Sequence, residues 1–253
     1  MSSAAPTSPS LAVQRGILGA VLLVLCWEGL ARGLHLPSYV LPAVSEILAG
    51  VWSKRAPLGE AAGYTLLEAL AGYGLGCLIG IGLAVTITML PALRGVILPA
   101  ATAINSVPVV GYSPLILLWF GIGVTSKMVM VAMAVSFAVF LSTLAGLDRV
   151  DRRAVDLMRS FGAGRLAILW RLRLPTALPL LLAGMRVSTV RSVIVAIITE
   201  MLGAYGGLGW VIFQAVLQID FVQVWAAIFV ASAASLSFFG LIGFLERKIL
   251  FWK

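Results

Sequence analysis

Long apolar segments separated by short polar ones make up most of this 253-residue chain. Six of them approach or exceed the roughly 20 residues that a helix needs to cross a bilayer. We place these six spans at about 16–33, 64–90, 96–123, 128–147, 176–202 and 222–244. The pattern therefore predicts an all-α integral membrane protein with about six transmembrane helices.

One segment, 148–175, is too polar to lie in hydrocarbon, because positions 148–173 hold seven arginines and three aspartates. An apolar stripe with i, i+3, i+4, i+7 spacing nevertheless predicts an amphipathic helix there. Its members are Ala154, Leu157, Met158 and Phe161. We expect Gly162 to end this helix. A second helix is expected to begin at Arg165 and to stop at Pro175. The loop is therefore a helix-turn-helix with a face to bury.

The third span is interrupted by Pro108 and Pro114, which are expected to break it near membrane depth. Irregular backbone is tolerated there only if it is buried in protein or lines a wet cavity. Two interpretations remain open for the polar residues of this segment. They either line such a cavity or satisfy the backbone groups that the break leaves free. These residues are Asn105, Ser106, Tyr112 and Ser113.

Three further patterns shape the expected packing. Gly72, Gly76 and Gly80 have GxxxG spacing, which permits close helix–helix approach. A short amphipathic helix after Pro42 is expected at the membrane interface, and a short half-helix or surface helix is expected within 203–220. Ser126 and Lys127 are expected to form a polar turn before the fourth span.

Composition supports the membrane assignment: 61% of the residues are hydrophobic and only 11% are charged, and the mean hydropathy is +1.07. A soluble domain averages about 25% charged residues. The net charge of +8 does not indicate nucleic acid, because the basic residues gather at the ends of the apolar runs. With the N-terminus inside, twelve basic residues face the cytoplasm and four face outward. The positive-inside rule therefore predicts cytoplasmic termini and a cytoplasmic loop 148–175.

The expected organisation has three parts: a mobile cytoplasmic N-terminus at 1–15, a first transmembrane helix with an interfacial helix at 16–58, and a core at 59–253. No catalytic set is present. The chain lacks a GxxxxGK[ST] phosphate loop, and its single histidine, His35, has no candidate metal-binding partner. We therefore expect no enzyme activity and no bound metal.

Ionisable residues inside the membrane are then the functional candidates. Arg191 and Glu200 lie in the fifth span, nine residues apart, and do not face each other on one helix. Arg186 is interpreted as fixing helix packing by pairing, although an anion contact stays open. Glu68 either lies at headgroup level or faces protein. Glu28 and Arg32 are four apart, so they can pair.

Several motifs resemble one family. The polar loop is similar to the cytoplasmic loop of permeases of bacterial binding-protein-dependent ABC importers. Its motif here is Asp156-Leu-Met, then three residues, Gly162, nine residues and Leu172-Arg-Leu174-Pro175. The family pattern is Glu-Ala-Ala, three residues, Gly, nine residues and Ile-x-Leu-Pro. The segments 41–47, 107–123, 200–203 and 206–209 resemble the nitrate/sulfonate/taurine-type subfamily.

This resemblance implies a type I ABC importer permease fold in the bacterial inner membrane. The chain would form a translocation pathway for a small solute delivered by a periplasmic binding protein, either an anion of the nitrate, sulfonate or taurine kind or an aromatic or pyrimidine compound. Two ABC ATPase subunits would bind ATP and Mg, and this chain would bind no cofactor. A second permease, either identical or a paralogue, would complete the pathway. The alternative is a self-sufficient secondary transporter or channel, with Glu28, Glu68, Arg191 and Glu200 as ion-coupling groups.

Two residue sets follow from these expectations. The first, which would couple the permease to the ATPase, consists of Ala154, Asp156, Leu157, Met158, Arg159, Phe161, Gly162, Leu174 and Pro175. The loop arginines would flank the docked stripe and pair with ATPase carboxylates. The second set, which would line the substrate pathway, consists of Asn105, Ser106, Pro108, Tyr112, Ser113, Arg191 and Glu200.

Overall fold

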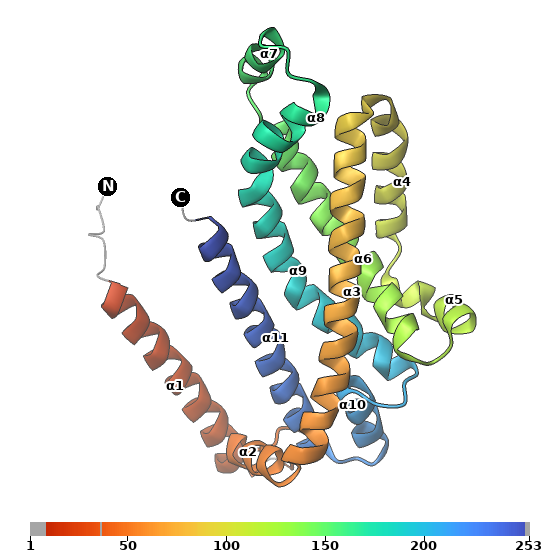
Figure 1. Ribbon diagram of the computed structural model, residues 1–253. Coiled ribbons are helices and arrows are strands. Elements are labelled where there is room, and N and C mark those ends of the chain that lie inside the picture. The colour runs from red at the N-terminus through yellow and green to blue at the C-terminus, as the bar shows by residue number, and fades with distance from the viewer. Residues whose placement is uncertain (1–8, 36, 251–253) are drawn as a thin grey trace.

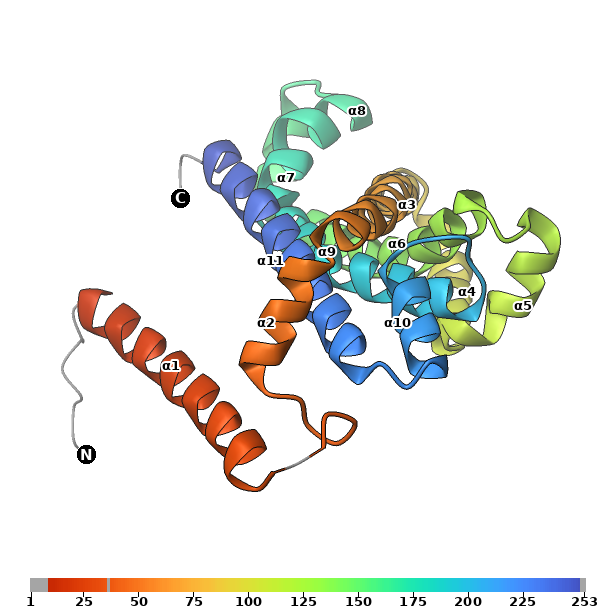
Figure 2. The same cartoon turned by 90° about the horizontal axis from the view of Figure 1, so that it is seen from below.

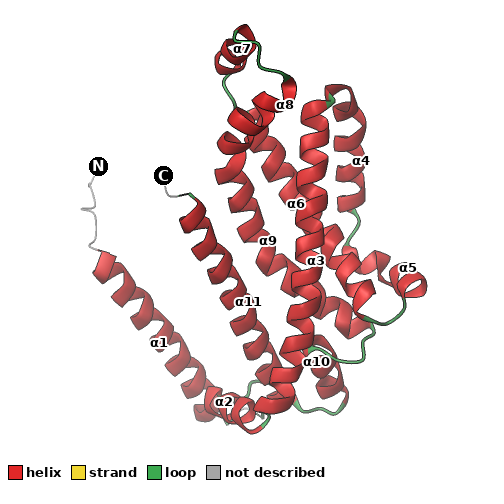
Figure 3. Ribbon diagram, viewed as in Figure 1, coloured by secondary structure: helices red, strands yellow, loops and turns green. Residues whose placement is uncertain are grey.

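The computed structural model describes residues 9–35 and 37–250, and all regular elements in this part are helices (Figure 3). In chain order they are α1 (Pro9–Gly33), α2 (Val44–Ser53), α3 (Arg55–Met89), η1 (Pro91–Leu93), α4 (Arg94–Ser106), α5 (Val109–Phe120), α6 (Val124–Asp148), α7 (Arg152–Ser160), α8 (Arg165–Ile168), η2 (Leu169–Arg173), α9 (Leu174–Leu202), α10 (Leu208–Leu217) and α11 (Phe221–Ile249). Here η1 is a 3₁₀ turn and η2 a π-helical turn.

Five helical segments are long and apolar enough to cross a membrane, and the bent pair α4–α5 makes six when it is counted as one span. The α4 and α5 segments meet at an angle of 93°. The N-terminal end of α1 and the C-terminal end of α11 lie toward the same end of the molecule as α7, while α2 and α10 lie at the opposite end (Figure 1). The predicted all-α membrane fold is confirmed. The predicted N-terminal segment 1–15 falls partly outside the described residues, and α1 already begins at Pro9.

Helices α3, α6 and α9 form the centre of the molecule, and the predicted glycine spacing explains how closely α3 and α6 approach. A Cβ at Gly72 would lie 2.5 Å from the Cβ of Val131, and one at Gly80 would lie 2.5 Å from the carbonyl oxygen of Ser136. Gly76 makes the same kind of approach to Val135. Only hydrogen fits at these positions, so the glycine stripe sets the distance between the two helices.

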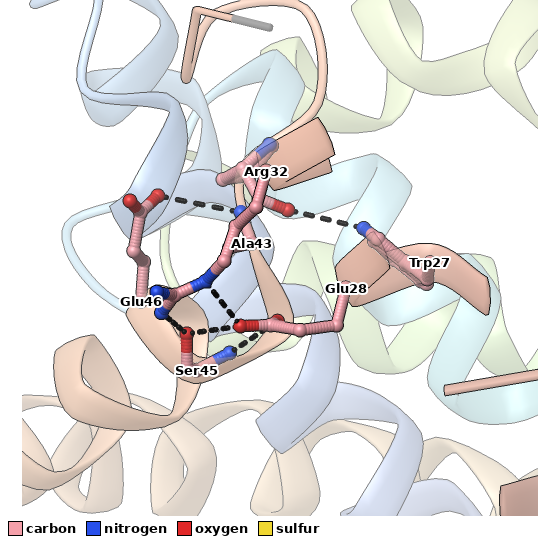
Figure 4. A network of polar contacts seen from close by, with 7 residues as sticks. Trp27, Glu28, Arg32, Ala43, Ser45 and Glu46 are labelled. Atoms are coloured by element: carbon pink, nitrogen blue, oxygen red, sulfur yellow. Dashed lines mark hydrogen bonds and ion pairs between the residues drawn. The ribbon is translucent and has the colours of Figure 1, made fainter. Parts of the chain in front are cut away.

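The α1 helix lies away from this centre, and its residues from Gln14 to Gly33 are almost all exposed (Figure 2). A polar network joins its end to the start of α2 (Figure 4). Arg32 pairs with Glu28 at 2.7 Å, which confirms the predicted pair, and Ser45 hydrogen-bonds to both side chains. The indole of Trp27 donates to the carbonyl of Pro42 at 3.0 Å. These bonds fix the turn between the first two helices.

The helix predicted after Pro42 is present as α2, but its apolar residues do not all share one environment. Val44 and Ile47 are buried, and Val51 packs against a cluster that includes Val224 on α11. Leu48, on the same helix, is 55% exposed.

Two predictions about helix ends are wrong. Pro114 does not break the helix, because it lies inside α5. Proline has no N–H for the carbonyl of Val110, and the hydroxyl of Ser113 donates to that carbonyl at 2.6 Å instead. The break falls before α5, at Val107 and Pro108, where α4 ends.

Pro175 likewise does not stop a helix, since the helical run from Arg165 to Leu202 is continuous. The π-helical turn η2 immediately precedes the proline. This wider turn changes the backbone pairing before Pro175, so the ring that would clash with a carbonyl in a regular α-helix is accommodated. The fifth span therefore grows directly out of the second helical part of the polar loop, which begins at Arg165.

Candidate functional site

The polar loop 148–175 is an ordered structure capped at both ends of α7. The side chain of Asp151 accepts a hydrogen bond from the backbone N–H of Arg153 at 2.9 Å, which is an N-cap. At the other end, Gly162 has φ +78° and donates to the carbonyl of Arg159, and Ala163 donates to that of Met158. This pair of bonds is a Schellman motif, so Gly162 ends the helix as predicted.

The α7 helix presents two opposite faces. Leu157 is 59% exposed and Phe161 at its C-terminus is 83% exposed, while Ala154 and Met158 on the same side are half-buried. At 100° per residue, this apolar stripe points about 160° away from the stripe formed by Arg152, Val155, Asp156 and Arg159. The apolar stripe thus leaves two large side chains available to a partner.

The second stripe faces back toward the membrane helices. Val155, which the sequence pattern did not single out, is buried there. Asp156 and Arg159 line a hollow of about 500 Å³ and form an ion pair at 3.4 Å. The structure therefore separates the predicted coupling residues, because Asp156 and Arg159 do not share a face with Leu157.

The last two predicted coupling residues lie outside α7 altogether. Leu174 packs against the core cluster that contains Leu147 and Ala177, and Pro175 is exposed in the first turn of α9. Both occupy the join between loop and membrane helix, so they can transmit a movement of the loop to α9.

The predicted pathway residues Arg191 and Asn105 do come together, although they are 86 positions apart. The guanidinium of Arg191 donates to the side-chain oxygen of Asn105 at 3.5 Å. Arg191 is exposed and shares its face of α9 with Val187 (68% exposed) and Ile194 (50% exposed). Asn105 also borders an apolar cavity of about 190 Å³ between α3, α4 and α6. A charged side chain therefore lies on an otherwise apolar face.

The remaining polar residues around the α4–α5 break bond to the backbone. The Tyr112 hydroxyl donates to the carbonyl of Ile104 at 3.0 Å, and the Ser106 hydroxyl donates to that of Thr102 at 2.8 Å. Ser113 caps the carbonyl freed by the proline, as described above. The interpretation that these groups satisfy the backbone accounts for their contacts. Pro108 is exposed and precedes the first residue of α5.

Glu200, near the C-terminal end of α9, has no exposed surface, and its carboxyl group lies at the N-terminus of α10. One of its carboxylate oxygens accepts a hydrogen bond from the backbone N–H of Gly209 at 2.6 Å. Gly207, with φ +96°, passes so close that a Cβ there would lie 2.3 Å from this carboxyl group. A negative charge at a helix N-terminus is favourable. In this chain Glu200 therefore acts as a cap for α10, and no exposed pathway surface contains it.

Lys127 is the main residue that sequence reasoning misplaced. With Ser126 it was expected in a polar turn, but both lie in the first turn of α6 and are fully buried. The Lys127 ammonium donates to the carbonyls of Ile122 and Gly203. It thereby caps the backbone where α5 and α9 end. The available signal was a lysine just after the glycines that end α5, since a lone cation at that point can bond to the freed carbonyls.

Glu68 completes this buried group and faces protein, as one of its two interpretations held. The carboxyl groups of Glu68 and Glu200 lie next to each other and next to Lys127. One oxygen of each carboxyl group has no hydrogen-bond partner. Buried charges need compensating partners, so these three residues from α3, α6 and α9 depend on one another.

Arg186 has the packing role that its pattern indicated. Its guanidinium lies 3.5 Å from Glu246 on α11 and 4.4 Å from the ring centre of Phe239. The contact with Glu246 is an ion pair without hydrogen-bond geometry, since the Nε of Arg186 and the paired oxygen of Glu246 both lack a hydrogen-bond partner. Within the described ranges, no three His, Cys, Asp or Glu side chains gather as a metal site.

Comparison with known proteins places this geometry among transport proteins. The family model described as "Binding-protein-dependent transport system inner membrane component" matches residues 63–251. The formylaminopyrimidine transport permease protein ThiX of Halalkalibacterium halodurans is 30% identical over 92% of this chain and 93% of its own length. The taurine transport system permease protein TauC of Escherichia coli is 30% identical over 98% of this chain and 92% of its own length.

Solved structures agree on the fold. An amino acid ABC transporter matches 78% of this chain and 96% of its own, with a TM-score of 0.63 and 20% identity. An inward-facing structure of the MetNI methionine ABC transporter matches 79% of this chain and 95% of its own, with a TM-score of 0.56 and 21% identity.

Proposed function

The chain belongs to the family of binding-protein-dependent transport system inner membrane components, and from this premise we propose how its parts serve ATP-driven import. It is the permease subunit of an ABC importer in the inner membrane, and it works with an ABC ATPase and a substrate-binding protein. The rival function, a self-sufficient secondary transporter or channel, is disfavoured by this membership.

The apolar face of α7 is the docking surface for the ATPase. The observation that carries this proposal is the exposure of Leu157 and Phe161 on a short helix that is capped at both ends and stands beyond the membrane helices. Burying one such side chain contributes about 1.5–3 kcal/mol. Because no phosphate loop occurs in the sequence, ATP and Mg bind to the two ATPase subunits, and this chain binds no cofactor.

Movement of the docked loop reaches the pathway through α9. A short capped turn at 161–164 joins α7 to the helical run from Arg165 to Leu202. This run is continuous, so a displacement of α7 that moves Arg165 is passed to the membrane helix that bears Arg191. Closure of the two ATPases on ATP brings their docked loops together and opens the pathway outward, which is a rigid-body switch between two states.

A second permease, either a further copy of this chain or a paralogue, completes the pathway. Arg191 is exposed on α9 of the single chain, and a charged side chain facing lipid is costly. The face with Val187, Arg191 and Ile194 therefore meets the second permease and the pathway between them. An arginine in this place favours a small anionic solute, in line with relatives named for taurine and aliphatic sulfonates.

The loop 148–175 and both termini face the cytoplasm. Basic residues are concentrated in this loop and near the C-terminus. The outer ends of α1 and α11 lie toward the same end of the molecule as α7. The positive-inside rule then assigns that end to the cytoplasmic side.

Co-purification with the ATPase tests the docking proposal. Leu157→Asp places a charge in the apolar stripe and is expected to abolish both ATPase binding and ATP-driven uptake. Gly162→Pro, which removes the N–H that donates to Arg159, should have the same effect. Leu157→Met keeps the stripe apolar and serves as the control. Full ATPase binding by Leu157→Asp would contradict the proposal. ATP-independent uptake by the chain alone in liposomes would instead favour the secondary transporter.

A further inference from the structure

The hollow beneath α7 concentrates arginine side chains from elements that are distant in sequence. We name it the basic hollow and define it by Arg94, Arg152, Arg159, Arg173, Asp148 and Asp156, which line its volume of about 500 Å³. A smaller hollow of about 120 Å³ adjoins it, shares Arg159 and Arg173, and adds Arg165. The basic residues thus come from α4, α7, α8 and η2.

The two aspartates do not neutralise these arginines. Asp148 is engaged by Arg94, whose two terminal nitrogens lie 3.2 and 2.7 Å from its two oxygens. Asp156 pairs with Arg159. Within residues 9–35 and 37–250, neither Arg152 nor Arg173 forms an ion pair with an acidic side chain. The basic hollow therefore keeps two uncompensated positive charges, and Arg165 adds a third at its edge.

The position of the hollow favours an anion of a particular kind. Arg94 begins α4, Asp148 ends α6, and Arg173 directly precedes α9. Three helices of the membrane-spanning segments therefore begin or end around the hollow. Basic pockets between membrane helices on the cytoplasmic side bind anionic headgroups, and guanidinium groups match phosphate oxygens with paired hydrogen bonds.

We propose that the basic hollow is a binding site for a phosphate-bearing anion, in which the ligand bridges α7 to the membrane helices. Arg152 and Arg173 are its principal contacts, and the Arg94–Asp148 pair holds one wall in place. The ligand binds on the face of α7 opposite to the apolar stripe. It therefore sets the angle at which α7 stands from the membrane without competing for the exposed Leu157 and Phe161.

Native mass spectrometry of the purified full chain in a neutral detergent tests this site. The probes are a short-chain phosphatidylglycerol and inorganic phosphate, with short-chain phosphatidylcholine as the zwitterionic reference. Arg173→Gln is expected to weaken binding of the anionic probe roughly five-fold, the effect of one basic residue at an anionic surface. Arg152→Gln should have a similar effect, and the double variant should lose binding.

Arg171→Gln is the matched control. Arg171 lies in the same π-helical turn and is exposed, yet it lines neither hollow. This variant removes the same charge from the same element and should bind the anionic probe like the wild type. Circular dichroism on all variants shows whether each one folds.

The outcomes separate the possible sources of the anion. Binding of phosphatidylglycerol alone supports a lipid headgroup site, and binding of inorganic phosphate supports a site for a soluble phosphate. The proposal is overturned if folded Arg173→Gln and Arg171→Gln bind the anionic probes equally. A separate co-purification with the ATPase adds a second refuting outcome. The proposal is overturned if Arg173→Gln weakens ATPase binding there but binds both anionic probes like the wild type in the mass-spectrometry assay, because the arginine then serves the protein partner. The assay uses the chain without its ATPase, so it does not depend on the docking proposal.

Discussion

Replacing Gly80 by alanine probes the close approach between α3 and α6. A Cβ at Gly80 would lie 2.5 Å from the carbonyl oxygen of Ser136 and 2.8 Å from the backbone nitrogen of Phe140. An ordinary carbon–oxygen contact is about 3.3 Å, so the new methyl group overlaps the oxygen by roughly 0.8 Å. Both neighbours are backbone atoms of α6, and no rotation of a side chain can relieve the overlap.

The magnitude follows from a comparison with Gly82. A Cβ at Gly82 meets nothing within 4 Å, so Gly82→Ala adds the same methyl group to the same helix without a clash. Each variant gains about 1 kcal/mol of helix propensity. Because this gain is common to both, the difference between them isolates the steric cost. Overpacking costs about 1–3 kcal/mol, and rigid backbone neighbours favour the upper half of that range.

The assay is the apparent melting temperature of each purified variant in detergent, at a fixed heating rate. For a protein of this size, a difference of about 2 kcal/mol corresponds to roughly 4–8 °C. Gly80→Ala should melt below the wild type, while Gly82→Ala should melt at or slightly above it. Equal melting temperatures for the two variants would show that α6 can move away freely and would refute the reasoning.

Three other substitutions test separate parts of the structure. Lys127→Met should prevent stable folding, because it leaves the buried carboxyl groups of Glu68 and Glu200 without their cation. The expected loss of stability is about 3–5 kcal/mol. Adding Glu68→Gln should restore part of the expression of folded protein. Gly162→Ala should destabilise α7 by about 1–2 kcal/mol because φ is +78° there, seen as faster hydrogen exchange of the loop. Burial raises the pKa of Asp220, but hydrogen bonds from Lys54 and from a backbone N–H outweigh this effect and lower the pKa below its usual value. Asp220→Asn should therefore melt at a lower temperature than the wild type at neutral pH.

The sign of the Asp220 effect can be checked by titration. A depressed pKa in the folded state means that the carboxylate stabilises the protein above its unfolded-state pKa, and this stability is lost as the pH falls through the folded-state pKa. The gap between wild type and Asp220→Asn should therefore close in acid, and a constant gap would contradict the account. For Gly162→Ala the control is Gly164→Ala, where φ is −73°. Equal hydrogen exchange of the loop in Gly162→Ala and Gly164→Ala would show that the positive φ of Gly162 does not account for the effect.

Local patterns in the sequence predicted the membrane fold, because each of their physical causes acts over a few neighbouring residues. Apolar length indicated the spans, and charge density indicated the loop. The spacing of Ala154, Leu157, Met158 and Phe161 gave α7 its apolar stripe. Gly162 ends that helix because it can adopt a positive φ. The glycine spacing of α3 was also enough to predict close helix packing, since a stripe of small residues has little other use in a membrane helix.

The sequence determined which segments cross the membrane and which segment stays outside it, since hydropathy and charge are properties of single residues. Only the tertiary structure decided which polar groups meet. The partners of Lys127 include the carbonyl of Gly203, which is 76 positions away. The contact of Arg191 with Asn105 and the cap that Glu200 forms on α10 likewise depend on how the helices pack. A buried charge needs a partner, but nothing local identifies that partner. The packing of α3, α6, α9 and α10 brings the groups together.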